Sequence, residues 1–342
     1  MDASLLLLYR MGSKEAPFIE LPLKIQSDPM ESMHRHEDEN RLPDGFEDYY
    51  REQFGPRWPQ LLSSLLEPST RVDRLNAFFE SIPTPPAKSM DVPWSTMPGV
   101  GHAFRLAHAL HDPRRDARGL LETYRMDPAS MIAASALEVQ PGDRVLDMCA
   151  APGGKSLLLA EAMGDAGRLV ANELSPTRRA KLKTILEDYL PGEQRKHIQV
   201  TGHDATRWGL HEPDYYDRVL LDAPCSSERH VLGKEKERAR WKPGRSKQLS
   251  RRQYALLCAA LGACKPGGRI VYATCALSKL ENDGVMERLL KRKGDQCVKW
   301  QTTFPEPFVE ATEHGWRILP DHSDGWGPMY WSILQKRTGA VL

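Results

Sequence analysis

The sequence predicts a doubly wound α/β fold preceded by a small helical region, and three observations support this. Beyond Asp127, apolar runs of strand length alternate with helical segments, as in a parallel sheet with helices on both faces. Five prolines between Ile82 and Pro98 interrupt the chain before that alternation and predict a linker. Before the linker, residues 46–79 space aromatic residues and leucines at intervals of three and four, the period of a helix.

Composition narrows the class of protein. The chain has 342 residues, 40% hydrophobic and 27% charged, enough for a full core and, by length, two domains. The longest apolar run near the N-terminus, residues 5–8, is far below the roughly 18 residues of a membrane span, so we expect neither membrane insertion nor secretion. The six cysteines form no CxxC pair and no zinc-ligand spacing, which favours free thiols in a reducing cytoplasm and no metal site.

The N-terminal part divides into two regions. Residues 1–40 have no clear period and contain the polar run HRHEDEN, so we expect a loosely held extension. That acidic run is unlike a transit peptide and favours the cytoplasm, with the mitochondrion as the alternative in a eukaryote. Within residues 41–120, the periods predict helices over 46–68 and 71–82, ahead of the Pro-rich linker.

Residues 121–342 hold the alternating elements. Asp127 as N-cap and Pro128 at the first helical position predict the start of a helix that ends before the turn QPGD. Strands are expected at 144–150, 168–174, 197–204, 216–224 and 269–275, with a last sheet strand at 329–334, and helices at 154–163, 176–190, 249–263 and 279–291. Ligands of such sheets bind at the carboxyl ends of the strands.

The stretch DMCAAPGGKS, residues 147–156, ends like a phosphate-binding loop. That motif requires a glycine five residues before Gly154, where this chain has Cys149, so an ATP-dependent enzyme is disfavoured. The remaining pattern is a strand, a turn of small residues and a helix N-terminus. Gly153 and Gly154 would let the backbone approach a ligand, and the positive helix end favours a carboxylate.

Acidic residues follow the next two predicted strands. Glu173 lies twenty residues beyond Gly153, the spacing at which an acid binds ribose hydroxyls in doubly wound folds. Because the G-x-G-x-x-G pattern of dinucleotide sites is absent, a smaller nucleoside ligand fits better. Asp204 would accept a hydrogen bond from an adenine amino group or, equally, cap a local turn.

Two cysteines close apolar runs that we expect to form adjacent central strands. Cys225 ends the sequence DAPC and Cys275 ends the sequence TC. A positive loop nearby would favour the thiolate, the reactive form of cysteine. In contrast, we expect Cys258 and Cys264 to be inert fillers of a helix.

A basic run follows DAPC directly. Residues 228–252 contain ten Lys or Arg and three acids. A solvated loop and a surface for RNA phosphates are the two interpretations, and the position after DAPC favours RNA. Trp241 within the run would stack on a base or pack its own loop, and His230 would assist proton transfer or be an ordinary polar residue.

The motifs LDMCAAPGGKS, NELSPTRRAKL, DAPCSSERH, ATCALSKLEN and DGWGPMY together resemble the Sun-type family of RNA cytosine-C5 methyltransferases. The match runs from about residue 127 to 336, and its pattern is most similar to the small-subunit ribosomal RNA branch. The resemblance implies a seven-stranded, mostly parallel Rossmann-like methyltransferase sheet over 121–342. It also implies S-adenosylmethionine as methyl donor and RNA as partner, rRNA before tRNA.

The resemblance also implies roles for individual residues. Cys275 would attack C6 of cytosine, Cys225 would help to release the methylated product, and Asp222 would hydrogen-bond at N3 and the amino group. The implied cofactor residues are Cys149, Ala150, Ala151, Pro152, Gly153, Gly154, Lys155, Glu173, Arg178, Asp204 and Asp222. No role for Lys155 follows from the sequence.

Alternatives stay open at this point. The same fold without catalysis would be an RNA-binding or ribosome-assembly factor, and a tRNA would replace rRNA as substrate without any change in the motifs. Because we find no appended RNA-binding module, we expect residues 44–118, the basic run or a protein partner to select the RNA. We expect a monomer.

Overall fold

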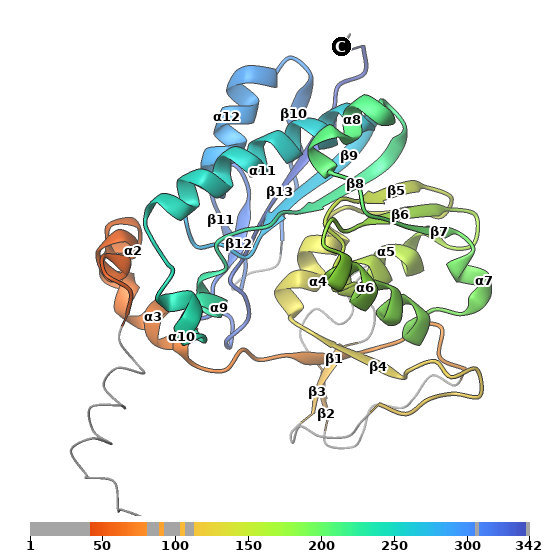
Figure 1. Ribbon diagram of the computed structural model, residues 1–342, viewed down its shortest axis with the longest axis horizontal. Coiled ribbons are helices and arrows are strands. Elements are labelled where there is room, and N and C mark those ends of the chain that lie inside the picture. The colour runs from red at the N-terminus through yellow and green to blue at the C-terminus, as the bar shows by residue number, and fades with distance from the viewer. Residues whose placement is uncertain (1–41, 81–88, 92–102, 107–112, 305–307, 340–342) are drawn as a thin grey trace, which may run out of the picture. The chain divides into compact units, whose positions relative to one another are not determined.

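The computed structural model describes residues 42–80, 89–91, 103–106, 113–304 and 308–339, with backbone only for 89–91 and 103–106. The predicted extension at 1–40 and most of the Pro-rich segment lie outside these residues. The described residues belong to one compact unit, Leu42–Leu342, drawn in Figure 1. Within them, no helix has the length and apolar character needed to cross a membrane.

The main sheet has nine strands among the described residues, in the order β11-β12-β13-β9-β8-β5-β6-β7, with β10 paired to β13. The pairs among β9, β8, β5, β6 and β7 are parallel, and those of β10 to β13 are antiparallel. The strands are β5 (Arg144–Asp147), β6 (Arg168–Asn172), β7 (Ile198–Thr201), β8 (Tyr216–Asp222), β9 (Cys264–Thr274), β10 (Cys297–Lys299), β11 (Glu310–Ala311), β12 (Trp316–Ile318) and β13 (Met329–Lys336). The mixed α/β fold is confirmed, but the expected count of seven strands is wrong because the short β10, β11 and β12 extend the antiparallel edge.

Helices cover both faces of this sheet (Figure 1). One face carries α4 (Pro128–Ser135), α5 (Gly154–Met163) and α6 (Pro176–Tyr189), and the other carries α8 (Trp208–His211), α11 (Gly244–Ala263) and α12 (Asp283–Lys293). The short helices are α7 (Gly192–Arg195), α9 (Glu228–Leu232), α10 (Glu235–Arg238) and η2 (Ala205–Arg207). Each face has its own apolar core cluster. Two sheet faces buried beneath helices explain why the central strands have almost uninterrupted apolar sequences.

Local signals place several boundaries correctly. The predicted helix over 154–163 is observed with those bounds, and the N-cap at Asp127 is confirmed, because its side chain accepts a hydrogen bond from the Ala129 N–H at 2.9 Å. Several other boundaries are shifted: β5 ends at Asp147 and not at residue 150, and α11 begins at Gly244 and not at residue 249. Cys264 is the first residue of β9 and not part of a helix, and the helix expected from residue 279 begins at Asp283.

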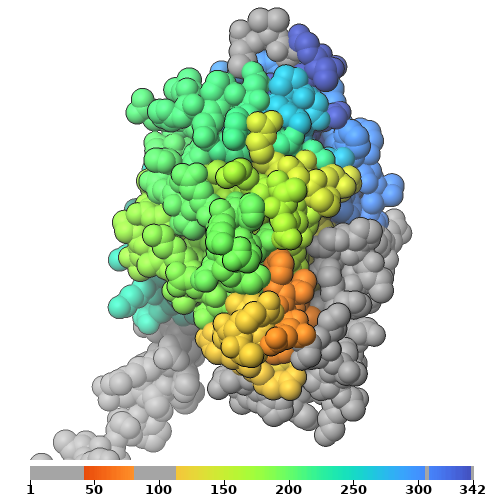
Figure 2. Space-filling model, turned by 90° about the vertical axis from the view of Figure 1, so that its right-hand side faces the viewer, coloured from red at the N-terminus to blue at the C-terminus, as the bar shows by residue number. Residues whose placement is uncertain are grey.

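The N-terminal region is only partly helical. Helices α2 (Phe46–Phe54) and α3 (Trp58–Leu66), joined by η1 (Gly55–Arg57), confirm the first helical prediction. The helix predicted over 71–82 is wrong, because residues 72–75 form β1. That strand belongs to a second sheet, β2-β3-β1-β4, with β2 (Ser89–Asp91), β3 (Ala103–Leu106) and β4 (Thr123–Met126). Figure 2 shows β1 and β4 side by side, in orange and gold.

Trp241 lies in the core beneath α2 and does not face solvent. Only 5% of its surface is exposed, and its ring centroid lies 4.9 Å from that of Phe46 and 6.3 Å from that of Tyr50. The alternative of a base-stacking Trp241 is therefore wrong. Instead, the tryptophan joins the basic segment between α10 and α11 to the N-terminal helices.

We predict that Trp241→Ala lowers the free energy of unfolding by about 3–5 kcal/mol, because it leaves a cavity among buried aromatic rings. Leu210→Ala is the matched control: Leu210 is 77% exposed, and we expect a change within about 0.5 kcal/mol. Urea denaturation followed by circular dichroism measures both. A stable Trp241→Ala protein with weakened RNA binding would contradict this packing role.

Candidate active site

The loop after β5 leads from the sheet into α5. Asp147, the last residue of β5, is buried and accepts a hydrogen bond from the Ser156 hydroxyl at 2.7 Å. Burial raises the pKa of the Asp147 carboxyl to about 7, against the opposing effect of the Ser156 hydrogen bond. The N–H groups in the first turn of a helix have no partner within that helix. In α5, which begins at Gly154, these groups lie at the end of the loop that follows β5.

The two glycines of this loop also have a packing role that the sequence did not indicate. A Cβ built on Gly154 would lie 2.7 Å from Cε1 of Tyr124, and one on Gly153 would lie 3.0 Å from Cγ2 of Ile185. Gly153 also has a φ of 126°, a backbone conformation that side chains rarely adopt. Close packing against β4 and α6 therefore favours glycine at both positions, and the approach of the backbone to a ligand stays a prediction.

A cavity of about 450 Å³ lies at the carboxyl ends of β5, β6 and β7. Glu173 lines it and accepts a hydrogen bond from the Ser175 N–H at 2.9 Å. Its second oxygen, Oε2, is buried, lies 3.0 Å from Nη1 of Arg178 and accepts no hydrogen bond from the described residues. A carboxylate that lines a cavity and has unused acceptor capacity fits a ligand hydroxyl.

Asp204 lines the same cavity and caps η2. Its Oδ1 accepts hydrogen bonds from the Thr206 N–H at 3.1 Å and from the Thr206 hydroxyl at 2.8 Å. The hydrogen bonds from Thr206 lower the pKa of this exposed carboxyl. The capping alternative is therefore confirmed, while Oδ2 keeps its acceptor capacity for a ligand.

Cys149 lies between this cavity and a larger one. Burial raises the pKa of the Cys149 thiol well above its usual range, so it stays protonated. Arg178, which donates a hydrogen bond to the Ala151 carbonyl at 2.7 Å, lines both cavities as well. The two cavities therefore share walls, and ligands in them would lie next to each other.

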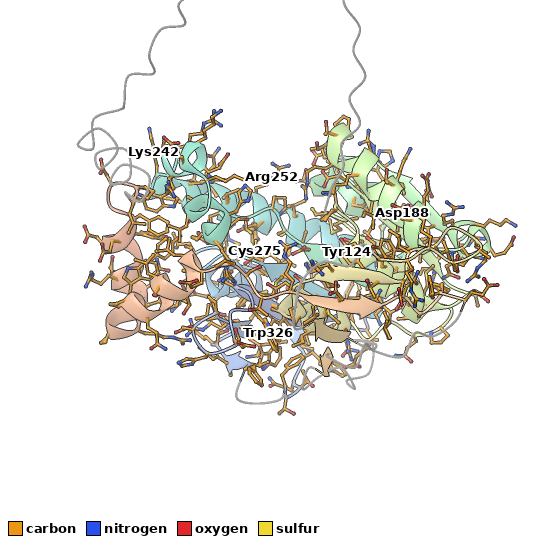
Figure 3. The ribbon with its side chains drawn as sticks, turned by 90° about the horizontal axis from the view of Figure 1, so that it is seen from below. Tyr124, Asp188, Lys242, Arg252, Cys275 and Trp326 are labelled. Carbon is orange, nitrogen blue, oxygen red and sulfur yellow. The ribbon has the colours of Figure 1, made fainter. Side chains whose placement is uncertain are left out.

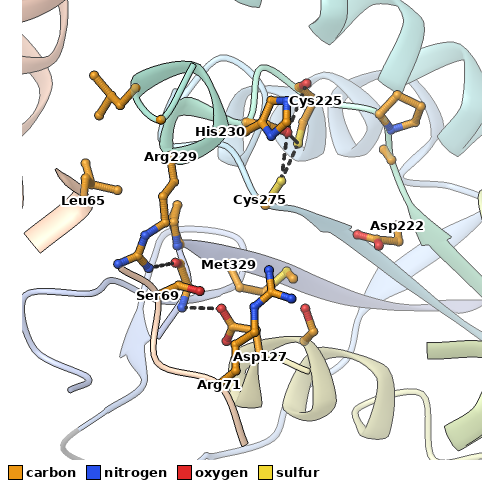
Figure 4. A pocket seen from close by; sticks show the side chains of 18 of the residues that line it. Leu65, Ser69, Arg71, Asp127, Asp222, Cys225, Arg229, His230, Cys275 and Met329 are labelled. Atoms are coloured by element: carbon orange, nitrogen blue, oxygen red, sulfur yellow. Dashed lines mark hydrogen bonds between the residues drawn. The ribbon is translucent and has the colours of Figure 1, made fainter. Parts of the chain in front are cut away.

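The larger cavity has a volume of about 840 Å³ and contains both strand-end cysteines (Figure 4). β8 and β9 pair in parallel with Asp222 opposite Ala273, so Cys225 and Cys275 follow neighbouring strands at one edge. Their Sγ atoms lie 3.1 Å apart. The Ser227 hydroxyl lies 3.1 Å from Sγ of Cys275 and 3.3 Å from Sγ of Cys225. The expected adjacency of these strands is confirmed.

The two thiols differ in acidity. The hydrogen bond with Cys225 lowers the pKa of Cys275 below its ordinary 9.0, and the hydrogen bond with Ser227 lowers it further. Together these two hydrogen bonds outweigh burial, which raises the pKa. The same contact raises the pKa of Cys225, and burial adds to that rise. Cys275 is therefore the more acidic thiol of the pair and ionises first as the pH rises, with Cys225 then as its hydrogen-bond donor.

Lys155 forms an ion pair with Asp222, a contact that the sequence did not predict. Its Nζ lies 2.8 Å from Oδ2 of Asp222 and 3.3 Å from Oγ of Ser130. Burial alone would lower the pKa of Lys155, but Asp222 and, further away, Cys275 raise it, so the lysine stays charged. A charged ion pair thus lies in the wall beside the cysteine cavity.

The structure brings most of the predicted site residues together. Asp222, Cys225, Cys275, Cys149, Ala151 and Arg178 line the larger cavity, and Ala150, Pro152, Gly154 and Lys155 line a smaller one of about 200 Å³ that also contains Cys149 and Asp222. Gly153 lines none of the three cavities. Ser227, Glu228 and Glu281 were missed, since their contacts join segments far apart in the sequence. No cluster of metal-ligand side chains occurs within the described residues.

The basic run is only partly available to a ligand. Seven of its ten cations are exposed, namely Lys234, Lys236, Arg240, Lys242, Lys247, Arg251 and Arg252. Arg229 instead donates hydrogen bonds to the carbonyls of Gly325 at 2.8 Å and Ser64 at 2.9 Å, and so has a structural role. Figure 3 shows Lys242 near the margin of that view and Cys275 nearer its middle.

Comparison with known proteins finds a matching family model and relatives that align with much of the chain. The family model of the 16S rRNA methyltransferases RsmB/F matches residues 134–335. The bovine (Bos taurus) 5-cytosine rRNA methyltransferase NSUN4 is 34% identical, over 86% of this chain and 88% of the relative. The zebrafish (Danio rerio) mitochondrial tRNA (cytosine(34)-C(5))-methyltransferase is 39% identical, over 64% of this chain and 61% of the relative.

A solved structure supports the fold. The methyltransferase homolog protein from Pyrococcus horikoshii superposes with a TM-score of 0.67 at 23% identity, over 85% of this chain and 94% of that one. At that identity the likeness concerns the fold alone.

We predict that iodoacetamide alkylates Cys275 faster than Cys225 at neutral pH, because only the thiolate reacts. Since the pKa of Cys275 is lowered, its alkylation rate should rise through a midpoint below pH 9.0 and then level off. Ser227→Ala removes one donor to the thiolate and should move that midpoint upward. Peptide mass spectrometry quantifies both thiols, with buried Cys264 as internal control. Faster alkylation of Cys225 than of Cys275 would contradict the assignment of Cys275 as the more acidic thiol.

Proposed function

Because the chain belongs to the RsmB/F family of RNA methyltransferases, we propose that it methylates C5 of a cytosine in small-subunit ribosomal RNA through a covalent adduct on Cys275. The observation that carries this proposal is the cysteine pair at 3.1 Å, beside the Asp222–Lys155 ion pair. The product is 5-methylcytosine. The family uses S-adenosylmethionine, and a covalent route through two thiols requires the arrangement described above.

The cofactor is proposed to bind across the shared wall of the two cavities. Glu173 would accept hydrogen bonds from the ribose hydroxyls, with Arg178 beside it, and Asp204 would accept one from the adenine amino group. Residues 149–155 would hold the methionine end. Bound S-adenosylmethionine supplies an electrophilic methyl group on its sulfonium. The place of Glu173 in the cavity wall, with one carboxylate oxygen that accepts no hydrogen bond from the described residues, supports this fit.

The proposed reaction begins with Cys275 in its thiolate form, which the lowered pKa of this thiol favours. The Cys275 thiolate adds to C6 of cytosine, and the electron pair of the C5–C6 bond makes C5 nucleophilic. Cytosine C5 then takes the methyl group. Asp222 accepts a hydrogen bond from the amino group, while charged Lys155 stabilises the negative charge that develops on the ring.

Release requires loss of the C5 proton and cleavage of the C6–S bond. Once the Sγ of Cys275 is bonded to carbon, the thiolate that raised the pKa of Cys225 is gone. The largest cause of the raised pKa of Cys225 is then removed, although burial still raises it. Once the Cys225 S–H proton has passed to solvent, its thiolate accepts the C5 proton. The electron pair of the C5–H bond restores the C5–C6 double bond, and Cys275 leaves as thiolate.

The choice of RNA is proposed from the relatives. The bovine relative and the family description name rRNA, whereas the zebrafish relative names tRNA, so tRNA is the second candidate. The name of the zebrafish relative also includes the mitochondrion, whereas the acidic N-terminal run favoured the cytoplasm. A protein partner, a monomeric state and an RNA-positioning role for residues 44–118 stay predictions. Exposed cations on and next to α10 and α11 support contact with RNA phosphates.

We predict that Glu173→Ala lowers S-adenosylmethionine affinity by at least about tenfold, because the ribose hydroxyls lose a buried acceptor. Glu193→Ala is the control, since Glu193 is an exposed surface glutamate outside the cavities. Isothermal titration calorimetry measures both. Equal affinity in Glu173→Ala would exclude this placement of the cofactor.

We predict that Cys225→Ala accumulates a covalent protein–RNA adduct with small-subunit rRNA, whereas Cys275→Ala gives none. The first variant still adds to C6 but lacks the thiol that assists release, and the second lacks the nucleophile. Denaturing gel electrophoresis with labelled rRNA and, separately, labelled tRNA measures the adduct. An adduct that forms in Cys275→Ala would show that Cys275 is not the nucleophile.

Bisulfite sequencing of total RNA, with and without the gene, then identifies the modified cytosine. A methylated site that disappears in rRNA supports the proposal, and one in tRNA selects the second candidate. Unchanged methylation everywhere, with intact RNA binding, would indicate a silent RNA-binding or assembly factor instead.

A further inference from the structure

Glu228 connects the segments that follow the two cysteines. Its side chain is fully buried. Its Oε2 accepts a hydrogen bond from the Leu277 N–H at 2.8 Å, two residues beyond Cys275. Its Oε1 accepts one from the hydroxyl of Ser226, the residue after Cys225. One carboxylate therefore spans both segments.

Helix α2 holds this carboxylate from the other side. The Tyr50 hydroxyl donates a hydrogen bond to Oε1 of Glu228 at 2.5 Å. About one turn further along α2, Oε1 of Gln53 accepts a hydrogen bond from the Lys279 N–H at 2.9 Å. The hydroxyl of Tyr49, the residue before Tyr50, lies 2.9 Å from that of Ser278. The N-terminal helices thus contact the segment after Cys275 directly and the segment after Cys225 through Glu228.

A second buried carboxylate extends the network. Glu281 accepts hydrogen bonds from the Ser226 N–H at 3.0 Å and from Nε2 of Gln253 at 2.8 Å. Glu228 makes no salt bridge with any residue that the structure describes, so only polar donors compensate its burial. Burial of a carboxylate without a cation is costly, and an apolar side chain could not bind these donors. These contacts indicate that Glu228 holds the segments after Cys225 and Cys275 in place.

We propose that Glu228 is a positioning residue for the two-cysteine site: it holds the segments after Cys225 and Cys275 so that the two Sγ atoms stay in hydrogen-bond contact, and Tyr50 fixes its carboxylate from α2. This inference rests on the proposed two-cysteine function and adds to it. The N-terminal helices then complete the catalytic site, in addition to any contact that they make with RNA.

The sign of a pH shift separates positioning from a mere charge effect. The negative charge of Glu228 raises the pKa of Cys275, so removing the charge alone would lower it. Loss of the Cys225 hydrogen bond would raise it instead. The other charged or titratable groups near Cys275 are Asp222 on β8, Lys155 on α5, His230 on α9 (Figure 4) and Cys225, with Glu281 near Cys225.

The test measures the pH midpoint of Cys275 alkylation by iodoacetamide in the RNA-free, full-length protein. We expect Glu228→Gln and Tyr50→Phe each to raise the midpoint by about 1 unit, with a smaller rise in Glu228→Asp, which keeps the charge. The controls are Tyr189→Phe, which removes a hydroxyl that donates to the Thr123 carbonyl, and Glu161→Gln, which breaks an ion pair with Arg74. Both should leave the midpoint unchanged.

A midpoint that falls in Glu228→Gln and is unchanged in Tyr50→Phe overturns the proposal, because Glu228 would then act through its charge alone. If Glu228→Gln does not fold, Tyr50→Phe decides in the same way. Alkylation needs no RNA. A failure of this positioning role can therefore be told apart from a failure of the proposed rRNA methylation.

A second measurement follows methyl transfer to small-subunit rRNA. We expect Tyr50→Phe to lower kcat about tenfold with unchanged KM for RNA, since the defect concerns the thiols and not binding. A raised KM with unchanged kcat would assign α2 to RNA binding instead and overturn the positioning role.

Discussion

The parallel pairing of β8 with β9 is the constraint on which the rest of the site depends. With Asp222 opposite Ala273, the segments that leave both strands begin at the same edge of the sheet. The Sγ atoms of Cys225 and Cys275 can then lie 3.1 Å apart, close enough for one thiol to donate a hydrogen bond to the other sulfur. A shift of one residue in this register would turn every side chain of one strand to the opposite face.

Segments from both ends of the described chain surround this edge. Arg57 from η1 lies 2.6 Å from carboxylate oxygens of Asp321 and Glu310, and Arg229 donates to carbonyls of the turn before β13 and of α3. Through Tyr50 and Trp241, the N-terminal helices pack against the segment after Cys225. Residues far from the chemistry in sequence are therefore part of its scaffold.

The sequence predicted the features that depend on local pattern. Strand ends with polar residues, the cap at Asp127 and the neighbouring strands of the two cysteines followed from period and spacing. Residues 72–75 were mistaken for a helix because pairing with β4 overrides their apparent period. The Lys155–Asp222 pair and the Tyr50–Glu228 contact join residues 67 and 178 positions apart, and no local signal encodes such contacts.

The wall shared by the two cavities, at Cys149 and Arg178, has a consequence for ligand design. An adenosine-like group beside Glu173 and a pyrimidine beside Asp222 would be separated only by this wall. One bisubstrate molecule joining the two by a short linker would bind its second half intramolecularly, which raises affinity without new contacts. Since burial raises the pKa of Cys149 whereas that of Cys275 is lowered, an electrophile on such an inhibitor should react with Cys275 in preference to Cys149.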